Sequence, residues 1–244
     1  MNAAPRSVVP ELLDELAPDD PRARRSRGDL RRIHVAMGTA AILRRSLARL
    51  HAGAPPRRIL ELGAGDGTLL LRTARGLGWR DVELTLLDRV ELLDDATRDA
   101  YASLGWTVRT QRGCVLDWAR EPCTAAGGGV SVPRYDLCVA TLFLHHFDAA
   151  ALATILRAVA ARCDGFVAVE PRRGRLARAG SRLVVLLGAN AVTRADAVTS
   201  VDAGFAGREL SSAWPADPRW HVEERAAGPF AQCLVAARGA NRGG

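Results

Sequence analysis

Two adjacent histidines, His145 and His146, are the residues in this chain best suited to proton transfer. They follow the largely apolar run 135–144, which predicts a buried strand, and open α/β sheets bind ligands at the carboxyl ends of such strands. Imidazole titrates near neutral pH, so a histidine there can take the proton of an acceptor hydroxyl. We favour His146 as the general base and keep His145 as the second candidate. A structural role of the pair in the turn is the competing interpretation.

A glycine-rich turn carries the second chemical signal. Residues 59–68 read Ile-Leu-Glu-Leu-Gly-Ala-Gly-Asp-Gly-Thr, which predicts a strand, a tight loop and the start of a helix, as in adenosine-cofactor sites. Glu61 and Asp66 would repel a pyrophosphate, and Thr68 occupies the place where the dinucleotide fingerprint has a glycine. An ammonium and a sulfonium suit these acids better, which indicates S-adenosylmethionine as the cofactor and S-adenosylhomocysteine as its product.

This turn resembles motif I of the class I, Rossmann-like S-adenosylmethionine-dependent methyltransferases, an acid followed by x-G-x-G-x-G. The match is position by position at Glu61, Gly63, Gly65 and Gly67. The resemblance implies that these residues, together with Ala64, bind the cofactor.

Further segments extend the resemblance over residues 57 to 170. Segment 81–88 is similar to the family's second strand, whose last acid accepts hydrogen bonds from the ribose hydroxyls, and this implies that Asp88 and the adjacent Arg89 lie at the cofactor. Segment 135–147 resembles the fourth strand with its L-H-H turn, which borders the methionine end of the cofactor and the acceptor. Thr141 is assigned to the cofactor on that ground.

Segment 113–118 looks like the region after the family's third strand, where an acid meets the adenine amino group. Many relatives have Asp directly after the glycine, but this chain has Cys114. Asp117 is therefore expected to take the adenine contact, with Trp118 beside it.

Three residues are candidates for binding the acceptor. His34 and Met37 lie on the helix expected before the first strand, a segment that often caps the acceptor pocket in this family, and Arg194 lies in the segment before the last two strands. Helix packing for the first two and a surface salt bridge for Arg194 are the alternative roles.

The acceptor is expected to be a small molecule. Amino-directed nucleic-acid methyltransferases carry N/D-P-P-Y/F/W after the fourth strand, whereas this chain has Ala-Thr-Leu-Phe at 140–143, so no nucleic-acid partner is expected. Resemblance to bacterial small-molecule methyltransferases, including those beside type III polyketide synthases, implies O-methylation of a phenolic or polyketide-type metabolite. C-methylation of a quinone or polyketide precursor, a nucleotide-dependent oxidoreductase and a non-catalytic partner protein with the same fold are the alternatives.

Composition adds limits of its own. The 244 residues carry a formal net charge of +7 but no lysine, so we attribute the 34 basic residues, all arginine, mainly to GC-rich codon usage. Five cysteines without C-x-x-C pairs or histidines at ligand spacing favour free thiols and no metal site. Without a secretory signal pattern or an apolar run near 20 residues, we expect a cytoplasmic protein with no membrane span. A homodimer is left open.

Alternating strand and helix patterns predict the α/β class with a seven-stranded, mostly parallel sheet, helices on both faces and one antiparallel C-terminal hairpin. We expect an N-terminal arm and helical cap over 1–55 and a cofactor-binding domain over 56–244, with a helical or irregular insert at 190–216. The arm should be loose up to residue 27, with at most a short helix over 10–16, and be followed by a single helix over 29–50. Further on, we expect a flexible loop over 121–133 and a helix over 178–187.

Overall fold

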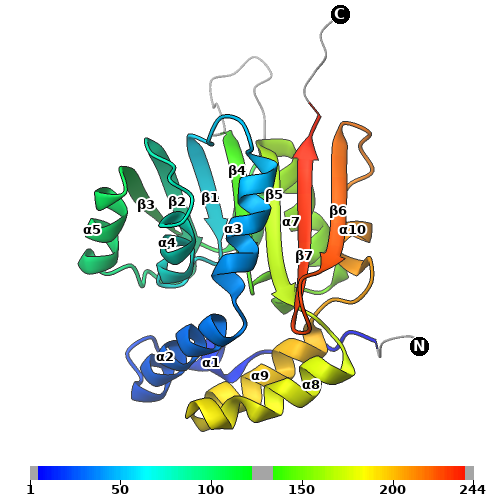
Figure 1. Cartoon of the computed structure of the whole chain (residues 1–244). Coiled ribbons are helices and arrows are strands. Elements are labelled where there is room, and N and C mark those ends of the chain that lie inside the picture. Colours follow the sequence, from blue (N-terminus) through cyan, green and yellow to red (C-terminus); the bar gives the residue numbers. More distant parts are fainter. Residues whose placement is uncertain (1–4, 123–133, 240–244) are drawn as a thin grey trace, which may run out of the picture.

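The computed structural model describes residues 5–122 and 134–239, which are built around a seven-stranded sheet (Figure 1). The strand order is β3-β2-β1-β4-β5-β7-β6. Strands β1 to β5 run parallel to one another, and β7 runs antiparallel to both of its neighbours, β5 and β6. The predicted parallel sheet closed by one reversed hairpin is confirmed. The strands are β1 (Arg58–Leu62), β2 (Val82–Asp88), β3 (Trp106–Arg112), β4 (Tyr135–Thr141), β5 (Cys163–Pro171), β6 (Trp220–Ala226) and β7 (Ala231–Arg238).

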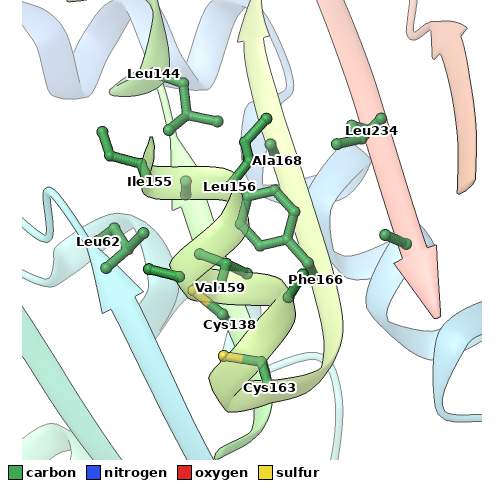
Figure 2. Packing of buried hydrophobic residues seen from close by; sticks show 14 of the residues in the cluster. Leu62, Cys138, Leu144, Ile155, Leu156, Val159, Cys163, Phe166, Ala168 and Leu234 are labelled. Carbon is green, nitrogen blue, oxygen red and sulfur yellow. The ribbon is translucent and has the colours of Figure 1, made fainter. Parts of the chain in front are cut away.

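Helices cover both faces of the sheet. One face carries α3 (Thr39–Leu50), α4 (Thr68–Ala74) and α5 (Asp95–Ser103), and the other carries α6 (Val115–Arg120), α7 (Ala149–Arg162) and α10 (Glu209–Ser212). The central strands β4 and β5 are buried almost throughout, as expected of parallel strands covered on both sides. Figure 2 shows the core beneath α7, where Leu156 and Val159 lie near Phe166 of β5 and Cys138 of β4.

A second group of helices lies at the end of the sheet toward which the parallel strands point (Figure 1). It consists of α1 (Leu12–Glu15), α2 (Pro21–Ala36), α8 (Arg175–Arg182), the 3-10 turn η2 (Leu183–Leu187) and α9 (Ala191–Ala203). Helix α9 contacts α1, α2 and α8. Segments from the N-terminal region and from the stretch between β5 and β6 thus form one structure, here called the helical cap.

The N-terminal region differs from the expected loose arm and single helix. Helix α2 begins at Pro21, where the Asp20 side chain accepts a hydrogen bond of 2.7 Å from the backbone N–H of Arg22. Asp followed by Pro is a strong helix start, because the capping carboxylate and the fixed proline φ both favour the first turn. Gly38, at φ 65°, then separates α2 from α3, so the helix expected over 29–50 is broken.

Smaller differences occur further along the chain. The helix expected over 178–187 is α8 followed by η2, and the short helix α6 was not expected. Most of the loop expected over 121–133 lies outside the described residues. The insert aromatics Phe205 and Trp214 are buried in the core.

Cys114, Cys138, Cys163 and Cys233 carry free thiols in the described part. No helix of that part has the length and apolar character needed to cross a membrane.

Candidate active site

A cavity of 540 Å³ lies between the carboxyl ends of β1 and β4 and the helical cap. The glycine turn, the turn after β4, α2, the α8–η2 segment and α9 all contribute to its wall. Nine of the residues selected from the sequence line it: His34, Met37, Glu61, Gly63, Ala64, Gly65, Thr141, His145 and His146. The carboxyl ends of two adjacent parallel strands thus bring residues 61–65 and 141–146, about 80 positions apart in the chain, to one cavity.

The glycine turn has the left-handed backbone that its sequence demands. Gly63, Gly65 and Gly67 have φ values of 65°, 55° and 72°. A Cβ on Gly63 would stand 2.1 Å from Cδ2 of Phe143, so that position has no room for a side chain. A Cβ on Gly65 would meet nothing within 4 Å, because this glycine faces open space at the cavity. The turn therefore leaves its backbone open to a ligand at Gly65.

Glu61 is a buried acid without a counter-charge. Its side chain is 3% exposed, and its Oε2 has no hydrogen-bond partner among the described residues. Burial, followed by the negative charges of Asp66 and Asp88, raises the pKa of Glu61 well above its ordinary value. A cationic donor at this end of the cavity would relieve both effects. The hydroxyl oxygen of Thr141, on the same cavity wall, is also buried and unpartnered.

Asp88 lies in a smaller hollow that adjoins the cavity and shares Ala64 and Gly65 with it. Its Oδ2 accepts a 2.9 Å hydrogen bond from the backbone N–H of Gly65, and its Oδ1 accepts one of 3.0 Å from that of Val90. Each carboxylate oxygen has a second lone pair. The side chain is thus fixed in place and can still accept two hydrogen bonds from a ligand.

Glu170, at the end of β5, organises the histidine turn η1 (Leu144–His146). Its side chain is fully buried, and its Oε1 accepts hydrogen bonds from the backbone N–H groups of Phe143 and Leu144, at 3.1 and 2.9 Å. Its Oε2 lies 2.9 Å from Nδ1 of His145. On the other side of that ring, Nε2 stands 3.4 Å from Oε1 of Glu11. Burial alone would lower the pKa of His145, but its interactions with Glu11 and Glu170 outweigh burial and raise it to about 9.

His146 has the opposite character. Its ring centroid lies 4.3 Å from that of His145, and its Nδ1 is 3.4 Å from Oδ2 of Asp14. Burial and the positive charge of His145 lower the pKa of His146. The side chain is 23% exposed and borders the cavity, whereas that of His145 is 3% exposed. His34, across the cavity, is also kept neutral, because burial lowers its pKa to about 4.

The N-terminal arm supplies residues that were not expected at this site. Glu11 accepts a hydrogen bond from the hydroxyl of Ser200, and Arg6 donates to the backbone carbonyls of His145 and Phe147 at 3.3 and 3.1 Å. Asp196 of α9 accepts hydrogen bonds from the first N–H groups of α1, 2.8 Å from Leu12 and 3.0 Å from Leu13. The available signal was the pair of acids at positions 11 and 14, which share one face if that segment is helical.

Two of the assigned residues lie away from both hollows. The side chain of Trp118 is buried in the core, with the guanidinium of Arg162 4.4 Å from its ring centroid, and it borders neither hollow. Arg194 is exposed on α9 and does not line the cavity, because the cavity-facing positions of that helix include Thr193 and Asp196.

Asp117 and Arg89 are exposed, Asp117 on α6 and Arg89 beyond β2 in an ion pair of 3.4 Å with Asp14. Neither lines the hollows, and their cofactor roles stay predictions.

No protein-family model matches the chain, and no curated protein matches it in sequence. Solved structures do match its fold. The plantazolicin methyltransferase BpumL, in complex with S-adenosylhomocysteine, is 10% identical, and 90% of this chain aligns with 91% of that protein at a TM-score of 0.62.

An O-methyltransferase family protein from Burkholderia thailandensis is 18% identical, with 92% of this chain covered and a TM-score of 0.56. Human N-acetylserotonin methyltransferase, in complex with S-adenosylmethionine, is 14% identical, with 93% covered and a TM-score of 0.50. This chain spans 62% and 61% of the length of these two proteins. Together with the strand order, these matches show that the chain has the Rossmann-like fold of the class I methyltransferases.

Proposed function

We propose that this protein transfers a methyl group from S-adenosylmethionine to a hydroxyl oxygen of a small phenolic or polyketide-type molecule. One observation carries the proposal. The 540 Å³ cavity joins the acidic glycine turn to the histidine pair and the helical cap, so a cofactor and an acceptor can meet in one cavity. The fold neighbours that carry S-adenosylhomocysteine or S-adenosylmethionine support the choice of cofactor.

The residues of the cavity suit this cofactor. Glu61 offers an unpartnered buried carboxylate oxygen to the ammonium of the methionine moiety, and Asp88 keeps two lone pairs for the ribose hydroxyls. Gly65 leaves the space over the turn open. The acids at positions 61 and 66 disfavour a pyrophosphate, as the sequence indicated. When bound, the cofactor supplies a methyl group made electrophilic by the sulfonium.

The work left to the protein is alignment and removal of the acceptor proton. Alignment of nucleophile, methyl carbon and sulfur can supply several kcal/mol of the barrier. The histidine pair lies on the same cavity wall as Thr141 and Leu142, directly after β4. His146, the less buried of the two rings, is the candidate for contact with the acceptor hydroxyl.

The acceptor end of the cavity is largely apolar. Leu30 and Ile33 of α2 face it, as does Met37 directly after that helix, together with Leu183 and Leu187 of η2. These side chains favour an aromatic or aliphatic acceptor body over a sugar or a nucleotide. That preference agrees with a phenolic or polyketide-type metabolite, and polar contacts are available from the histidine turn and from other lining residues such as His34 and Ser200.

Calorimetric titration with S-adenosylmethionine, S-adenosylhomocysteine and NADH tests the proposal first. Micromolar binding of the first two, without binding of NADH, is the expected result. A screen of phenols for methyl transfer follows, with His221→Ala, which removes an exposed histidine on β6, as the matched control for the histidine variants. Binding of NADH alone would overturn the enzyme class, and binding of none of the three would favour a non-catalytic partner protein.

A further inference from the structure

We propose that Glu11, His145 and His146 bind a divalent transition-metal ion, Zn²⁺ in the first instance, on the cavity wall. Each residue offers one ligand atom, and the three atoms lie within 4.8 Å of one another. Oε1 of Glu11 and Nε2 of His145 are 3.4 Å apart. Two ligand atoms of a tetrahedral ion at about 2.1 Å also stand about 3.4 Å apart. We expected no metal site because the cysteines and histidines lack the spacing of metal ligands. Glu11 is 134 residues from His145, so no local spacing could indicate that the two side chains meet.

The carboxylates beside the two imidazole rings are placed like the outer-shell partners of a metal site. Metal-binding histidines usually give their second ring nitrogen to a carboxylate, which fixes the ring and its tautomer. Glu170 holds Nδ1 of His145 at 2.9 Å, and Asp14 lies 3.4 Å from Nδ1 of His146. Nε2 of His145 is buried, has no hydrogen-bond partner in the described structure and stands next to Glu11.

Charge and ligand type favour the same class of ion. Four carboxylates, those of Glu11, Asp14, Glu170 and Asp196, gather around the histidine turn and the first turn of α1. Two imidazoles and one carboxylate form the ligand set of catalytic zinc sites and of mononuclear iron(II) sites, both of which keep a position open. All three proposed ligands line the cavity, so the open position would face the acceptor.

Such an ion would activate the acceptor hydroxyl in the proposed methyl transfer, and this chemical role rests on the proposed function. A hydroxyl bound to a Lewis-acidic ion loses its proton far more readily than a free hydroxyl. In methyl transfer, that proton would leave to solvent. The new O–C bond would form as the S–C bond of the sulfonium breaks, and the neutral thioether would depart. His146 would then activate the acceptor as a ligand of the ion and not as a free base.

Metal binding can be tested without cofactor or acceptor. Full-length, tag-free protein purified without chelators is dialysed and its metal content measured by elemental analysis. Metal-free protein is then titrated with Co²⁺, whose visible absorption reports coordination. We expect about one ion per chain. Loss of an outer-shell partner alone weakens metal binding about ten- to a hundredfold, so Glu11→Gln and His146→Asn, which each remove a ligand, should weaken Co²⁺ binding by at least about tenfold. His34→Ala, a cavity histidine outside the cluster, and His221→Ala should bind Co²⁺ like the wild type.

The outcomes separate this proposal from the proposed function. A metal content near zero, or equal Co²⁺ affinity in wild type and Glu11→Gln, would overturn the metal site. Circular dichroism of each variant identifies loss of fold, and Glu11→Gln keeps the size of the side chain. Iron in place of zinc in the purified protein would support the site and identify its ion. Metal binding without S-adenosylmethionine binding would leave the site standing and refute the methyltransferase proposal, whereas the reverse result would refute only the site.

Discussion

Replacing Glu61 with Gln should make the unliganded protein more stable and its cofactor complex weaker. Glu61 is buried, its Oε2 has no partner in the described structure, and Asp66 and Asp88 add negative charge nearby. An unsatisfied buried polar group costs roughly 1–3 kcal/mol, and more when it is charged. Removing the charge should therefore raise the free energy of unfolding by about 1 kcal/mol or more near pH 8. For a chain of this size, that corresponds to a Tm increase of roughly 2–4 °C.

The pH dependence of this effect has a definite sign. The folded state raises the pKa of Glu61, so it binds more protons than the unfolded state above the ordinary value of 4.5. The wild-type free energy of unfolding must then fall as the pH rises from that value through the folded pKa. The Gln variant lacks this contribution. The difference in the free energy of unfolding between the Gln variant and the wild type should therefore be absent near pH 4.5. It should grow as the pH rises toward the folded pKa of Glu61 and level off above that pKa.

The cofactor should respond in the opposite direction. A hydrogen bond to a charged group contributes about 1.5–3 kcal/mol, so Glu61→Gln should weaken S-adenosylmethionine binding by roughly ten- to a hundredfold. Urea denaturation between pH 5 and 8 and calorimetry with the cofactor measure the two effects. Glu83→Gln, an exposed carboxylate on β2, is the control. A Glu61→Gln protein that is less stable at every pH and binds the cofactor normally would refute the assignment of Glu61.

Three further predictions concern the rest of the site. Asp88→Ala should weaken S-adenosylmethionine binding by about 1.5–3 kcal/mol in calorimetry, because the ribose hydroxyls lose a charged acceptor; unchanged affinity would remove Asp88 from the cofactor site. His146→Ala should lower turnover in a methyl-transfer assay while cofactor affinity changes little, and loss of cofactor affinity would instead assign the histidine pair to the structure of the turn. Asp196→Ala should uncap α1 at a cost of roughly 1 kcal/mol and expose residues 5–16 to limited proteolysis, whereas Asp202→Ala on the same helix should not.

The elements that could be predicted from the sequence are those formed by residues close together in the chain. The strand, glycine turn and helix at 58–74 follow one another directly, so their residue types alone indicate the loop and its acids. The closing hairpin is local in the same way. The glycines at 63 and 65 were found because a left-handed backbone leaves a signature in residue type.

Contacts between distant segments left no comparable signature. Glu11 meets His145 and Ser200 only because α1 docks on α9, and the acids at positions 11 and 14 mark a shared face without indicating which segment it meets. Trp118 shows a second limit. Asp117 faces solvent on α6. A residue one step further along a helix points more than a quarter-turn away, and the side chain of Trp118 therefore enters the core. Its closeness to Asp117 in the sequence could not indicate this.

The docking of the N-terminal arm also has a consequence for the order in which the protein folds. Its hydrogen bonds join residues 184 and 197 positions apart, from Leu12 to Asp196 and from Arg6 to Ala203. Contacts of such long range carry a large loop-closure entropy and form late. During synthesis, the arm must wait until residues 196–203 have been made before it can dock. A partly folded chain should therefore form the glycine turn before the helical cap, and the cap should open first when the protein is stressed.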